Sequence, residues 1–332
     1  MTAIHNFILY KFILVIMGTF DDDSRMTKST KLSPISIGFC FAIGSAIMFA
    51  IRPIFVKLVY EQGVDSTTLI ALRMLFSAPI YIALLIYFLR DPKLRSRLTE
   101  PKSKNTRQLI TQISIVGILG YYFASFLDLL GLQYVTAQLG RMLLYSYPTF
   151  VVIFGAIFFG KPITLRTIIS LLLTYIGIAV IFGHDFNAFG GNVITGALFI
   201  LGSAISFSIY LLYSKPLIEQ VGSRLFTCLA LISASTSIFI HFLITHSIAN
   251  TTVNNHALLL IILIAIFCTV IPTFFTTAAI SRIGADRTGI VAMIGPGFTS
   301  IFAVLILNED FTIYHIIGII LTILGVSVLK RN

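Results

Sequence analysis

The chain contains 332 residues, of which 57% are hydrophobic and 11% are charged, and its mean hydropathy is +0.97. A soluble globular domain is close to half apolar and about a quarter charged, so these values exclude an ordinary soluble protein. A helix needs about 20 apolar residues to cross a bilayer, so ten crossings use about 200 residues and leave room for short loops only. We expect an all-α polytopic membrane protein without a separate soluble domain.

Apolar windows follow one another along the chain and predict ten transmembrane helices. They lie near residues 35–59, 66–89, 108–130, 136–159, 163–183, 192–214, 223–245, 257–281, 285–307 and 311–330. The connection at 90–107 is long, polar and highly charged, whereas the others are short, which predicts antiparallel neighbours. Residues 1–34 form an N-terminal extension and cytoplasmic start. Because the apolar stretch within 1–25 is too short to span, we expect these residues to be a misassigned start or a dispensable extension.

The formal net charge of +10 is explained by topology. Most of the 23 lysines and arginines fall on one set of helix ends, including seven in the 90–107 connection. The opposite ends carry acidic residues, namely Glu61, Asp65, Asp185, Glu309 and Asp310. The positive-inside rule therefore predicts a multi-pass protein of the inner (cytoplasmic) membrane with both termini in the cytoplasm. No basic face with interleaved aromatic residues remains, so a nucleic-acid partner is not expected.

The chain also contains an internal repeat. Shifting it by 148 residues aligns 132–181 with 280–329 without a gap, and 12 of the 50 positions are identical, including Pro148 with Pro296. The fronts of the two halves match at an offset of 158 residues, where the sequence GSAI occurs at 44 and again at 202.

These matches predict two repeats of five helices, at 35–183 and 192–330. Because five is an odd number, the second copy enters the membrane from the opposite side. The result is a pair of inverted repeats, an architecture typical of secondary transporters.

Two segments carry a resemblance to a known family. GLQYVTAQLGRMLLYSYPTFVVIFGAIFFGKPIT and SRIGADRTGIVAMIGPGFTSIFAVLILNEDFT, each followed by a last helix that contains glycine, resemble the two copies of the EamA repeat of the drug/metabolite transporter superfamily. The arginine of TLIALRMLFSAP, Arg73, also lies where that family commonly has one. The resemblance covers about residues 35–330 and implies a transporter fold, but not a solute.

The chain departs from the family pattern at one position. The repeat usually has an acidic residue before its fifth helix, which is Glu309 in the second half but Lys161 in the first. This difference argues against a symmetric role for the acid, and Lys161 is interpreted as a positive-inside anchor.

Several kinds of chemistry are not expected. The chain has no phosphate-binding GxxxxGK[ST] loop, so transport driven by its own ATP hydrolysis is not predicted. Cys40, Cys228 and Cys268 are far apart in apolar runs and are interpreted as buried small hydrophobic residues. No histidine or carboxylate cluster has metal-ligand spacing. We therefore expect no metal, no cofactor and no enzymatic activity.

Four ionisable residues inside the predicted spans are candidates for substrate binding, because such charges are costly unless they are paired or hydrated. Arg52, Arg73, Asp128 and Arg141 all belong to the first repeat and to the outer half of the membrane. Three cations against one acid predict attraction of a carboxylate or phosphate. Two structural alternatives stay open: Arg52 and Arg141 snorkel to the headgroups, and Arg73 is a structural partner of Asp128.

Helical spacing predicts polar faces that line a cavity. These faces are Gln138, Arg141, Tyr145 and Pro148 in the fourth span, Tyr121, Ser125 and Asp128 in the third, Ser203, Ser206, Tyr210 and Tyr213 in the sixth, and Thr269, Thr273 and Thr276 in the eighth. The alternative is that serine and threonine bond within their own helix and tyrosine lies at the membrane interface. Pro148 and Pro296 are predicted hinges beside the cavity.

Small residues recur in the last helix of each half. Ser170, Thr174 and Gly177 correspond to Gly318, Thr322 and Gly325. Such residues predict a close-packing face, either between the two halves or in a homodimer.

We therefore expect a secondary carrier that moves a small organic metabolite by alternating access. An anionic or zwitterionic solute is favoured, held by Arg73 and Arg141, with Tyr145 and Tyr210 shaping the pocket. Its expected partners are this solute and membrane lipid. The alternatives are a non-transporting membrane sensor or scaffold protein, and an exporter of cationic drugs or polyamines. The sequence does not choose between proton coupling and exchange.

Overall fold

The computed structural model describes residues 34–99, 105–160, 162–246, 253–292 and 294–329. Within these ranges the regular structure is entirely helical, which confirms the predicted class. The helices are α2 (Pro34–Glu61), α3 (Ser66–Phe88), α4 (Pro92–Thr99), α5 (Thr106–Gly117), η2 (Ile118–Phe123), α6 (Ala124–Leu132), α7 (Ala137–Leu144), α8 (Tyr147–Phe159), α9 (Leu165–Phe189), α10 (Asn192–Val221), α11 (Ser223–Thr245), α12 (Asn255–Ala265), η4 (Ile266–Val270), α13 (Ile271–Ala292), α14 (Gly295–Leu307) and α15 (Ile313–Leu329). The predicted extension at 1–25 and Lys161 lie outside the described residues.

A polar residue in the connection between α2 and α3 fixes where α3 begins. The carboxylate of Asp65 accepts hydrogen bonds from the backbone N–H groups of Thr67 and Thr68 at 2.8 and 3.0 Å. These groups have no partner within the first helical turn, so the cap satisfies them. Burial alone would raise the pKa of the Asp65 carboxyl, but the hydrogen bonds and the nearby His246 outweigh burial and hold this pKa below its usual value.

The fourth predicted span is broken into two helices. Tyr145 and Ser146 separate α7 from α8, and Pro148 lies in the first turn of α8, where its missing N–H removes no helical hydrogen bond. The ninth span is interrupted at the equivalent place: α13 ends at Ala292, and Pro296 lies in the first turn of α14. The two prolines therefore begin the second part of each broken span.

The predicted boundary between the eighth and ninth spans, at 281–285, is wrong. Helix α13 continues from Ile271 to Ala292 and directly follows α12 and η4. The polar stretch at 281–287 contains no proline, so the hydropathy falls there while backbone hydrogen bonding continues.

The helix bounds repeat with the same spacing that relates the two halves of the sequence. Helix α8 maps onto α14 residue for residue, and the first residues of α9 and α15 are likewise equivalent. The π-helices η2 and η4 begin at the equivalent residues Ile118 and Ile266. Gly160 and Asn308, which follow α8 and α14, both adopt left-handed backbone conformations with φ of 63° and 52°. The structural repeat thus extends into the third and eighth spans.

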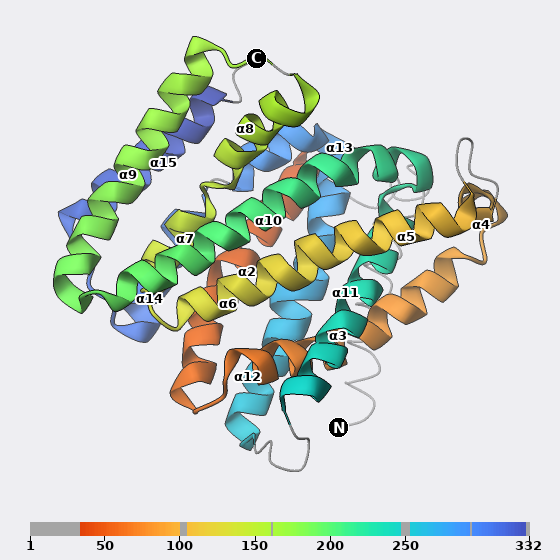
Figure 1. Cartoon of the computed structure of the whole chain (residues 1–332), viewed down its shortest axis with the longest axis horizontal. Coiled ribbons are helices and arrows are strands. Elements are labelled where there is room, and N and C mark those ends of the chain that lie inside the picture. Colours follow the sequence, from red (N-terminus) through yellow and green to blue (C-terminus); the bar gives the residue numbers. More distant parts are fainter. Residues whose placement is uncertain (1–33, 100–104, 161, 247–252, 293, 330–332) are drawn as a thin grey trace.

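The two halves pack on each other reciprocally (Figure 1). Helix α2 packs on α13 and α14 of the second half, and its counterpart α10 packs on α6 and α8 of the first half. Helix α3 contacts its counterpart α11, and α9 contacts its counterpart α15, the pair that lies side by side at one edge of Figure 1. This exchange of contacts is what a pseudo-two-fold relation between repeats produces.

Small residues allow α9 and α15 to approach closely. A Cβ atom added to Gly177 would lie 2.7 Å from the carbonyl oxygen of Gly318, and the Ser170 hydroxyl donates to the carbonyl oxygen of Gly325. The predicted close-packing face therefore joins the two halves of one chain, which is the first of the two alternatives.

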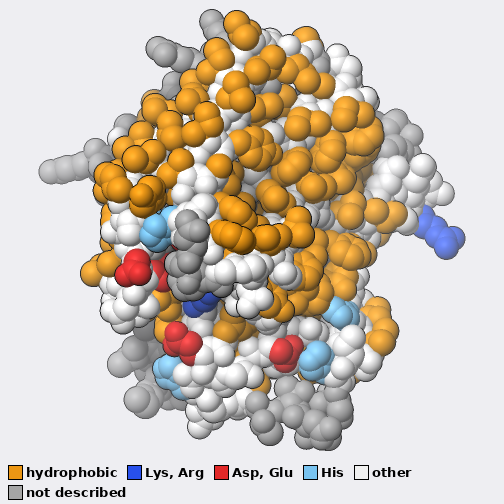
Figure 2. Space-filling model, turned by 60° about the vertical axis from the view of Figure 1, so that its left-hand side comes forward, with side chains coloured by type: hydrophobic (Ala, Val, Ile, Leu, Met, Phe, Trp, Pro, Cys, Tyr) orange, Lys and Arg blue, Asp and Glu red, His pale blue; other side chains and the backbone are white. Residues whose placement is uncertain are grey.

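The surface fits a lipid environment. Among the described residues, eight helices are long and apolar enough to cross a membrane, whereas Gly295–Leu307 and Ile313–Gly325 are apolar but shorter. The structure thus supports eight spans by length, and crossing by the other two stays a prediction. Figure 2 shows hydrophobic side chains over most of one face, with acidic and histidine side chains toward one end. Cys228 and Cys268 are buried as predicted, but the prediction for Cys40 is wrong, because it is exposed.

Candidate functional site

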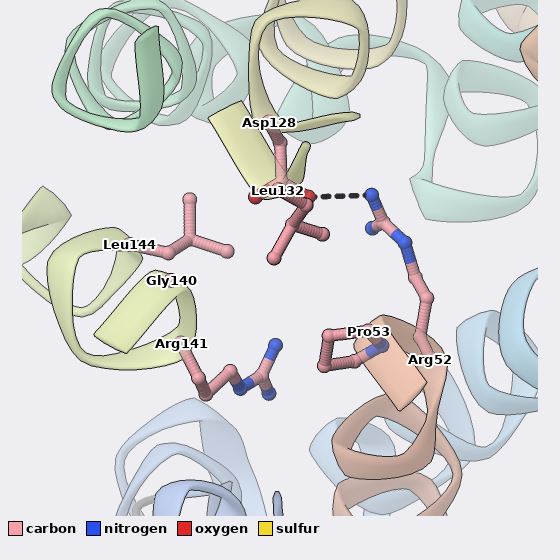
Figure 3. Close-up of a pocket in the computed structure, with 7 residues that line it drawn as sticks. All are labelled: Arg52, Pro53, Asp128, Leu132, Gly140, Arg141 and Leu144. Carbon is pink, nitrogen blue, oxygen red and sulfur yellow. Dashed lines mark hydrogen bonds and ion pairs between the residues drawn. The ribbon is translucent and has the colours of Figure 1, made fainter. Parts of the chain in front are cut away.

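A small polar pocket lies where the first, third and fourth spans meet. Its lining comes from α2, α6 and α7 and consists of Arg52, Pro53, Asp128, Leu132, Gly140, Arg141 and Leu144. Figure 3 shows the Asp128 carboxylate facing the Arg52 guanidinium, while the guanidinium of Arg141 lies next to Pro53. Three of the residues predicted to bind a solute, Arg52, Asp128 and Arg141, are therefore together in one site.

Arg52 and Asp128 form an ion pair across this pocket. Nη2 of Arg52 lies 2.7 Å from Oδ2 of Asp128, and the two side chains are 18% and 10% exposed. The alternative in which Arg73 pairs with Asp128 is wrong. Arg73 is almost completely buried on α3, does not line the pocket, and its Nε has no hydrogen-bond partner.

Arg141 forms no ion pair with an acidic side chain among the described residues. Its guanidinium stacks over the ring of Tyr145, with 5.1 Å between Cζ and the ring centroid, and its Nε is buried without a hydrogen-bond partner. The Tyr145 hydroxyl donates to the carbonyl oxygen of Ala292 at 2.6 Å. Tyr145 therefore supports Arg141 and ties the break between α7 and α8 to the end of α13.

The pocket is smaller than an organic metabolite. Its volume is about 10 Å³, which holds roughly one water molecule. A larger solute therefore needs α2, α6 or α7 to move apart. The pocket nevertheless carries a net positive charge, because its lining contains two guanidinium groups and a single carboxylate.

The N-terminus of α7, which carries Arg141 one turn later, is held by the other half of the chain. Glu309 accepts hydrogen bonds from the backbone N–H groups of Ala137 and Gln138 at 2.7 and 3.3 Å. Nε2 of Gln138 donates to the carbonyl oxygen of Asp310 at 3.0 Å. Burial raises the pKa of the Glu309 carboxyl, although the hydrogen bond from Ala137 opposes this effect. Gln138, predicted to line the cavity, is instead part of this contact.

The predicted polar face of the sixth span does not line this pocket. Ser203 and Ser206 of α10 donate to the carbonyl oxygens of Ala124 and Leu119, both at 2.7 Å. The hydroxyl of Tyr210 lies 2.9 Å from that of Tyr121, and Tyr210 is packed among hydrophobic residues of α5 and α11. These side chains fasten α10 to η2 and α6, so, unlike in the alternative, Ser203 and Ser206 do not bond within their own helix and Tyr210 does not lie at the membrane interface.

The threonine face of the eighth span, in contrast, bonds within its own span, as the alternative predicts. Thr269 donates to the carbonyl oxygen of Ile264 at 3.0 Å, and Thr273 donates to that of Thr269 at 2.6 Å. The first of these bonds spans five residues, as expected beside the π-helix η4. The polar lining of the pocket is therefore smaller than the sequence predicts.

A second cluster is not predicted by the sequence. His184 and Asp185 at the end of α9 meet His315 near the start of α15, and one ligand atom from each lies within 4.8 Å of the others. The expectation from the sequence concerned only clusters with metal-ligand spacing along the chain, and this one is formed by packing. No spacing could have revealed it, since the two histidines are far apart along the chain.

Comparison with known proteins identifies the family. The model of the EamA-like transporter family matches residues 36–183 and 194–331, one match in each half. The chain belongs to the EamA-like transporter family. It is therefore a multi-pass membrane protein of a transporter family, and the predicted resemblance is confirmed.

Individual relatives agree with this assignment. The uncharacterized transporter YcbK of Bacillus subtilis is 28% identical over 89% of this chain and 93% of its own length. An uncharacterized transporter of Clostridium kluyveri is 25% identical over 87% of this chain and 91% of its own. A solved crystal structure superposes with a TM-score of 0.62 over 89% of this chain and 96% of that one at 15% identity, which supports the fold alone.

Proposed function

We propose that this member of the EamA-like family is a secondary transporter that moves a small anionic or zwitterionic metabolite across the cytoplasmic membrane. The observation that carries the proposal is the pocket in which Arg141 has no acidic partner beside the Arg52–Asp128 ion pair, among the described residues. A partly buried guanidinium without a counter-charge is costly, so a carboxylate or phosphate that enters the pocket offsets this cost. The buried Arg73 interacts electrostatically with Arg52 and Asp128, so it adds to the positive potential at the pocket.

In this proposal Arg141 and Arg52 bind the solute. A carboxylate of the solute takes the place of Asp128 as the ion-pair partner of Arg52. Tyr145 orients Arg141 through ring stacking. Arg73 acts through its field, because it does not line the pocket. Tyr210 and Gln138 contribute by packing α10 and α7.

Transport in this proposal occurs by alternating access between the two five-helix halves. Support comes from the breaks in α7–α8 and α13–α14, which lie at equivalent positions of the two repeats, and from Pro148 and Pro296, which begin the second part of each broken span. Paired π-helices, common at functional sites, give further support. Because most basic residues lie on one set of helix ends, we assign both termini to the cytoplasm.

The test is a thermal-shift screen of the purified protein with carboxylates, amino acids, nucleotides and cationic drugs, because a ligand that binds only the folded form raises the melting temperature. We expect an anionic class to stabilise the wild type and not Arg141→Ala. Arg282→Ala is the matched control, since Arg282 also stacks on an aromatic ring, with 5.4 Å from Cζ to the centroid of Phe41, but lies outside the pocket. Stabilisation by cations alone, or an anion effect that survives in Arg141→Ala, contradicts the proposal.

A non-transporting sensor or scaffold protein is the second candidate, and the small volume of the pocket favours it. The two candidates differ in proteoliposomes loaded with the stabilising solute. A transporter exchanges internal labelled solute for external solute, and the exchange falls in Arg141→Ala. A sensor binds the solute without any flux.

A further inference from the structure

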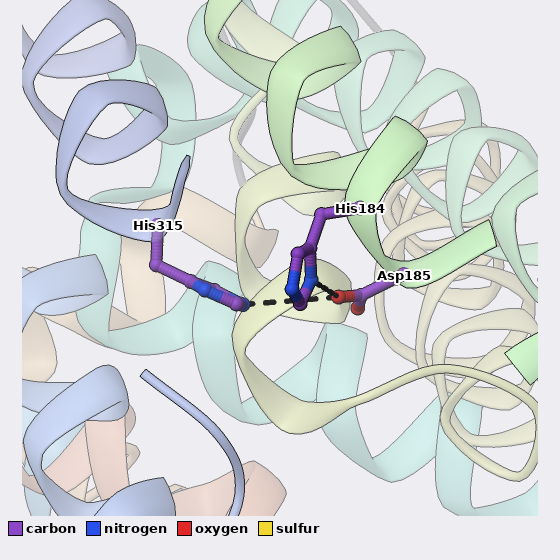
Figure 4. A group of neighbouring side chains, drawn as sticks. All are labelled: His184, Asp185 and His315. Atoms are coloured by element: carbon purple, nitrogen blue, oxygen red, sulfur yellow. Dashed lines mark hydrogen bonds and ion pairs between the residues drawn. The ribbon is translucent and has the colours of Figure 1, made fainter. Parts of the chain in front are cut away.

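The cluster of His184, Asp185 and His315 joins the two halves of the chain at one end of the molecule. His184 and Asp185 belong to α9 of the first half, and His315 belongs to α15 of the second half. Nδ1 of His184 and Nε2 of His315 lie 3.2 and 3.7 Å from Oδ1 of Asp185. Figure 4 shows the two imidazole rings approaching this carboxylate from different helices.

Asp185 is buried, so its negative charge needs a compensating partner within the cluster. Its side chain is 1% exposed, and that of His315 is 2% exposed. In the part of the chain that the structure describes, no lysine or arginine forms an ion pair with this carboxylate, and Lys57 interacts with it only at longer range. A buried carboxylate is costly unless it is paired with a cation or binds a metal.

The distances fit metal ligands better than a purely hydrogen-bonded triad. The 3.7 Å separation between His315 and Asp185 is too long for a hydrogen bond. Two ligands of a tetrahedral zinc ion, each about 2.0–2.1 Å from the metal, lie about 3.3 Å apart. The two separations from Oδ1 of Asp185 are close to that value, and all three ligand atoms lie within 4.8 Å of one another. Rotations of the two imidazole rings therefore bring the three atoms to one ion.

Neighbouring groups hold the ligands as they do in metal sites. Oδ2 of Asp185 accepts a hydrogen bond from the Thr136 hydroxyl at 2.7 Å, which leaves Oδ1 for an ion. Two groups of Thr312 meet Nδ1 of His315: the backbone N–H donates to it at 3.2 Å, and Oγ1 lies 3.0 Å away. A metal on Nε2 places the ring proton on Nδ1, so the contact with the N–H then gives way and Oγ1 accepts that proton. Such partners orient ligands and raise their basicity. His184 is 23% exposed, so water and ions can enter beside it.

We propose that His184, Asp185 and His315 form a binding site for one divalent transition-metal ion, and that this ion is Zn²⁺. Two imidazole nitrogens and one carboxylate oxygen suit zinc, with water in the fourth position. The ion joins α9 to α15. It also fixes Thr136, which caps α7 by accepting a hydrogen bond from the N–H of Leu139. The site does not depend on which solute the protein carries.

The test is titration of the tag-free, full-length protein in detergent with Co²⁺, followed by displacement with Zn²⁺. We expect one saturable Co²⁺ site per chain with visible absorption bands, which Zn²⁺ removes. His315→Gln and Asp185→Asn should weaken binding by about tenfold or more. His184→Gln is a second variant on a partly exposed side chain, and gel filtration and circular dichroism verify the fold of each variant.

His246→Gln is the matched control. His246 also lies beside a carboxylate, 3.3 Å from Oδ1 of Asp65, but among the described residues no third ligand joins this pair. We expect this variant to bind Co²⁺ like the wild type. No saturable Co²⁺ binding by the wild type overturns the proposal. So does equal binding by the wild type, His315→Gln and His184→Gln.

Discussion

Replacing Glu309 by alanine removes the contact that holds the start of α7. The carboxylate accepts hydrogen bonds from the N–H groups of Ala137 and Gln138, which lie in the first turn of α7 and have no helical partner. Loss of a helix cap costs about 0.5–2 kcal/mol, and loss of a negative charge at a helix N-terminus costs about 0.3–1 kcal/mol. Since removal of a partly buried charge offsets some of this, we expect a net loss of about 1–2 kcal/mol.

In a domain of about 150–250 residues each kcal/mol corresponds to about 2–4 °C, so Glu309→Ala should melt a few degrees below the wild type. The chain contains no tryptophan, so circular dichroism of the detergent-solubilised protein is the suitable measurement. Asp310→Ala is the matched control, because the Asp310 side chain is exposed and only its carbonyl oxygen binds Gln138. Equal melting temperatures for the two variants would refute the capping role.

Three further predictions concern stability and use the same measurement. Gly177→Ala should lower stability by about 1–3 kcal/mol, because the new Cβ meets the backbone of α15. Gly183→Ala should leave stability unchanged, because a Cβ at this position of the same helix has nothing within 4 Å. Equal effects of the two variants contradict the packing argument. Asp128→Asn should cost about 2–4 kcal/mol because Arg52 loses its ion-pair partner, and adding Arg52→Met should recover part of the loss. The pKa of Asp65 is lowered in the folded protein, so its negative charge stabilises the fold at pH values above the unfolded pKa of 3.8. This contribution is lost as the pH falls through the folded pKa. The melting temperatures of the wild type and Asp65→Asn should therefore converge at acid pH, and a constant difference contradicts this.

Much of the fold follows from the sequence because lipid imposes a strong constraint on composition. The apolar windows predict the helices, and the internal repeat predicts which of them correspond. Hydropathy reports where a segment leaves lipid, however, and not where a helix ends. This is why the break after α7 lies inside one apolar window and why α13 continues through the polar stretch at 281–287.

The site is less predictable because it depends on how each helix is rotated about its axis. Arg52 and Arg73 are equivalent candidates by depth, and only the packing of α2 and α3 decides that Arg52 reaches Asp128. The same holds for the serine and tyrosine faces, because a polar stripe on a helix either lines a cavity or donates hydrogen bonds to carbonyl oxygens of a neighbouring helix. The pairing of His184 with His315 arises from the contact between α9 and α15, which sequence spacing does not encode.

The repeated fold and the unrepeated charges have separate roles. The helix breaks and π-helices occur in both halves, so they belong to the shared framework. The charges do not repeat: at the offsets that relate the halves, Tyr210 stands for Arg52 and Gly289 stands for Arg141. The hydrogen bond from Tyr145 to Ala292 connects the repeated helix breaks with the unrepeated charge of Arg141. Tyr145 lies at the break after α7 and stacks with Arg141, and Ala292 is the last residue of α13, just before the break in the second half. We therefore expect a movement at either break to shift Arg141, which is the coupling that the proposed carrier requires.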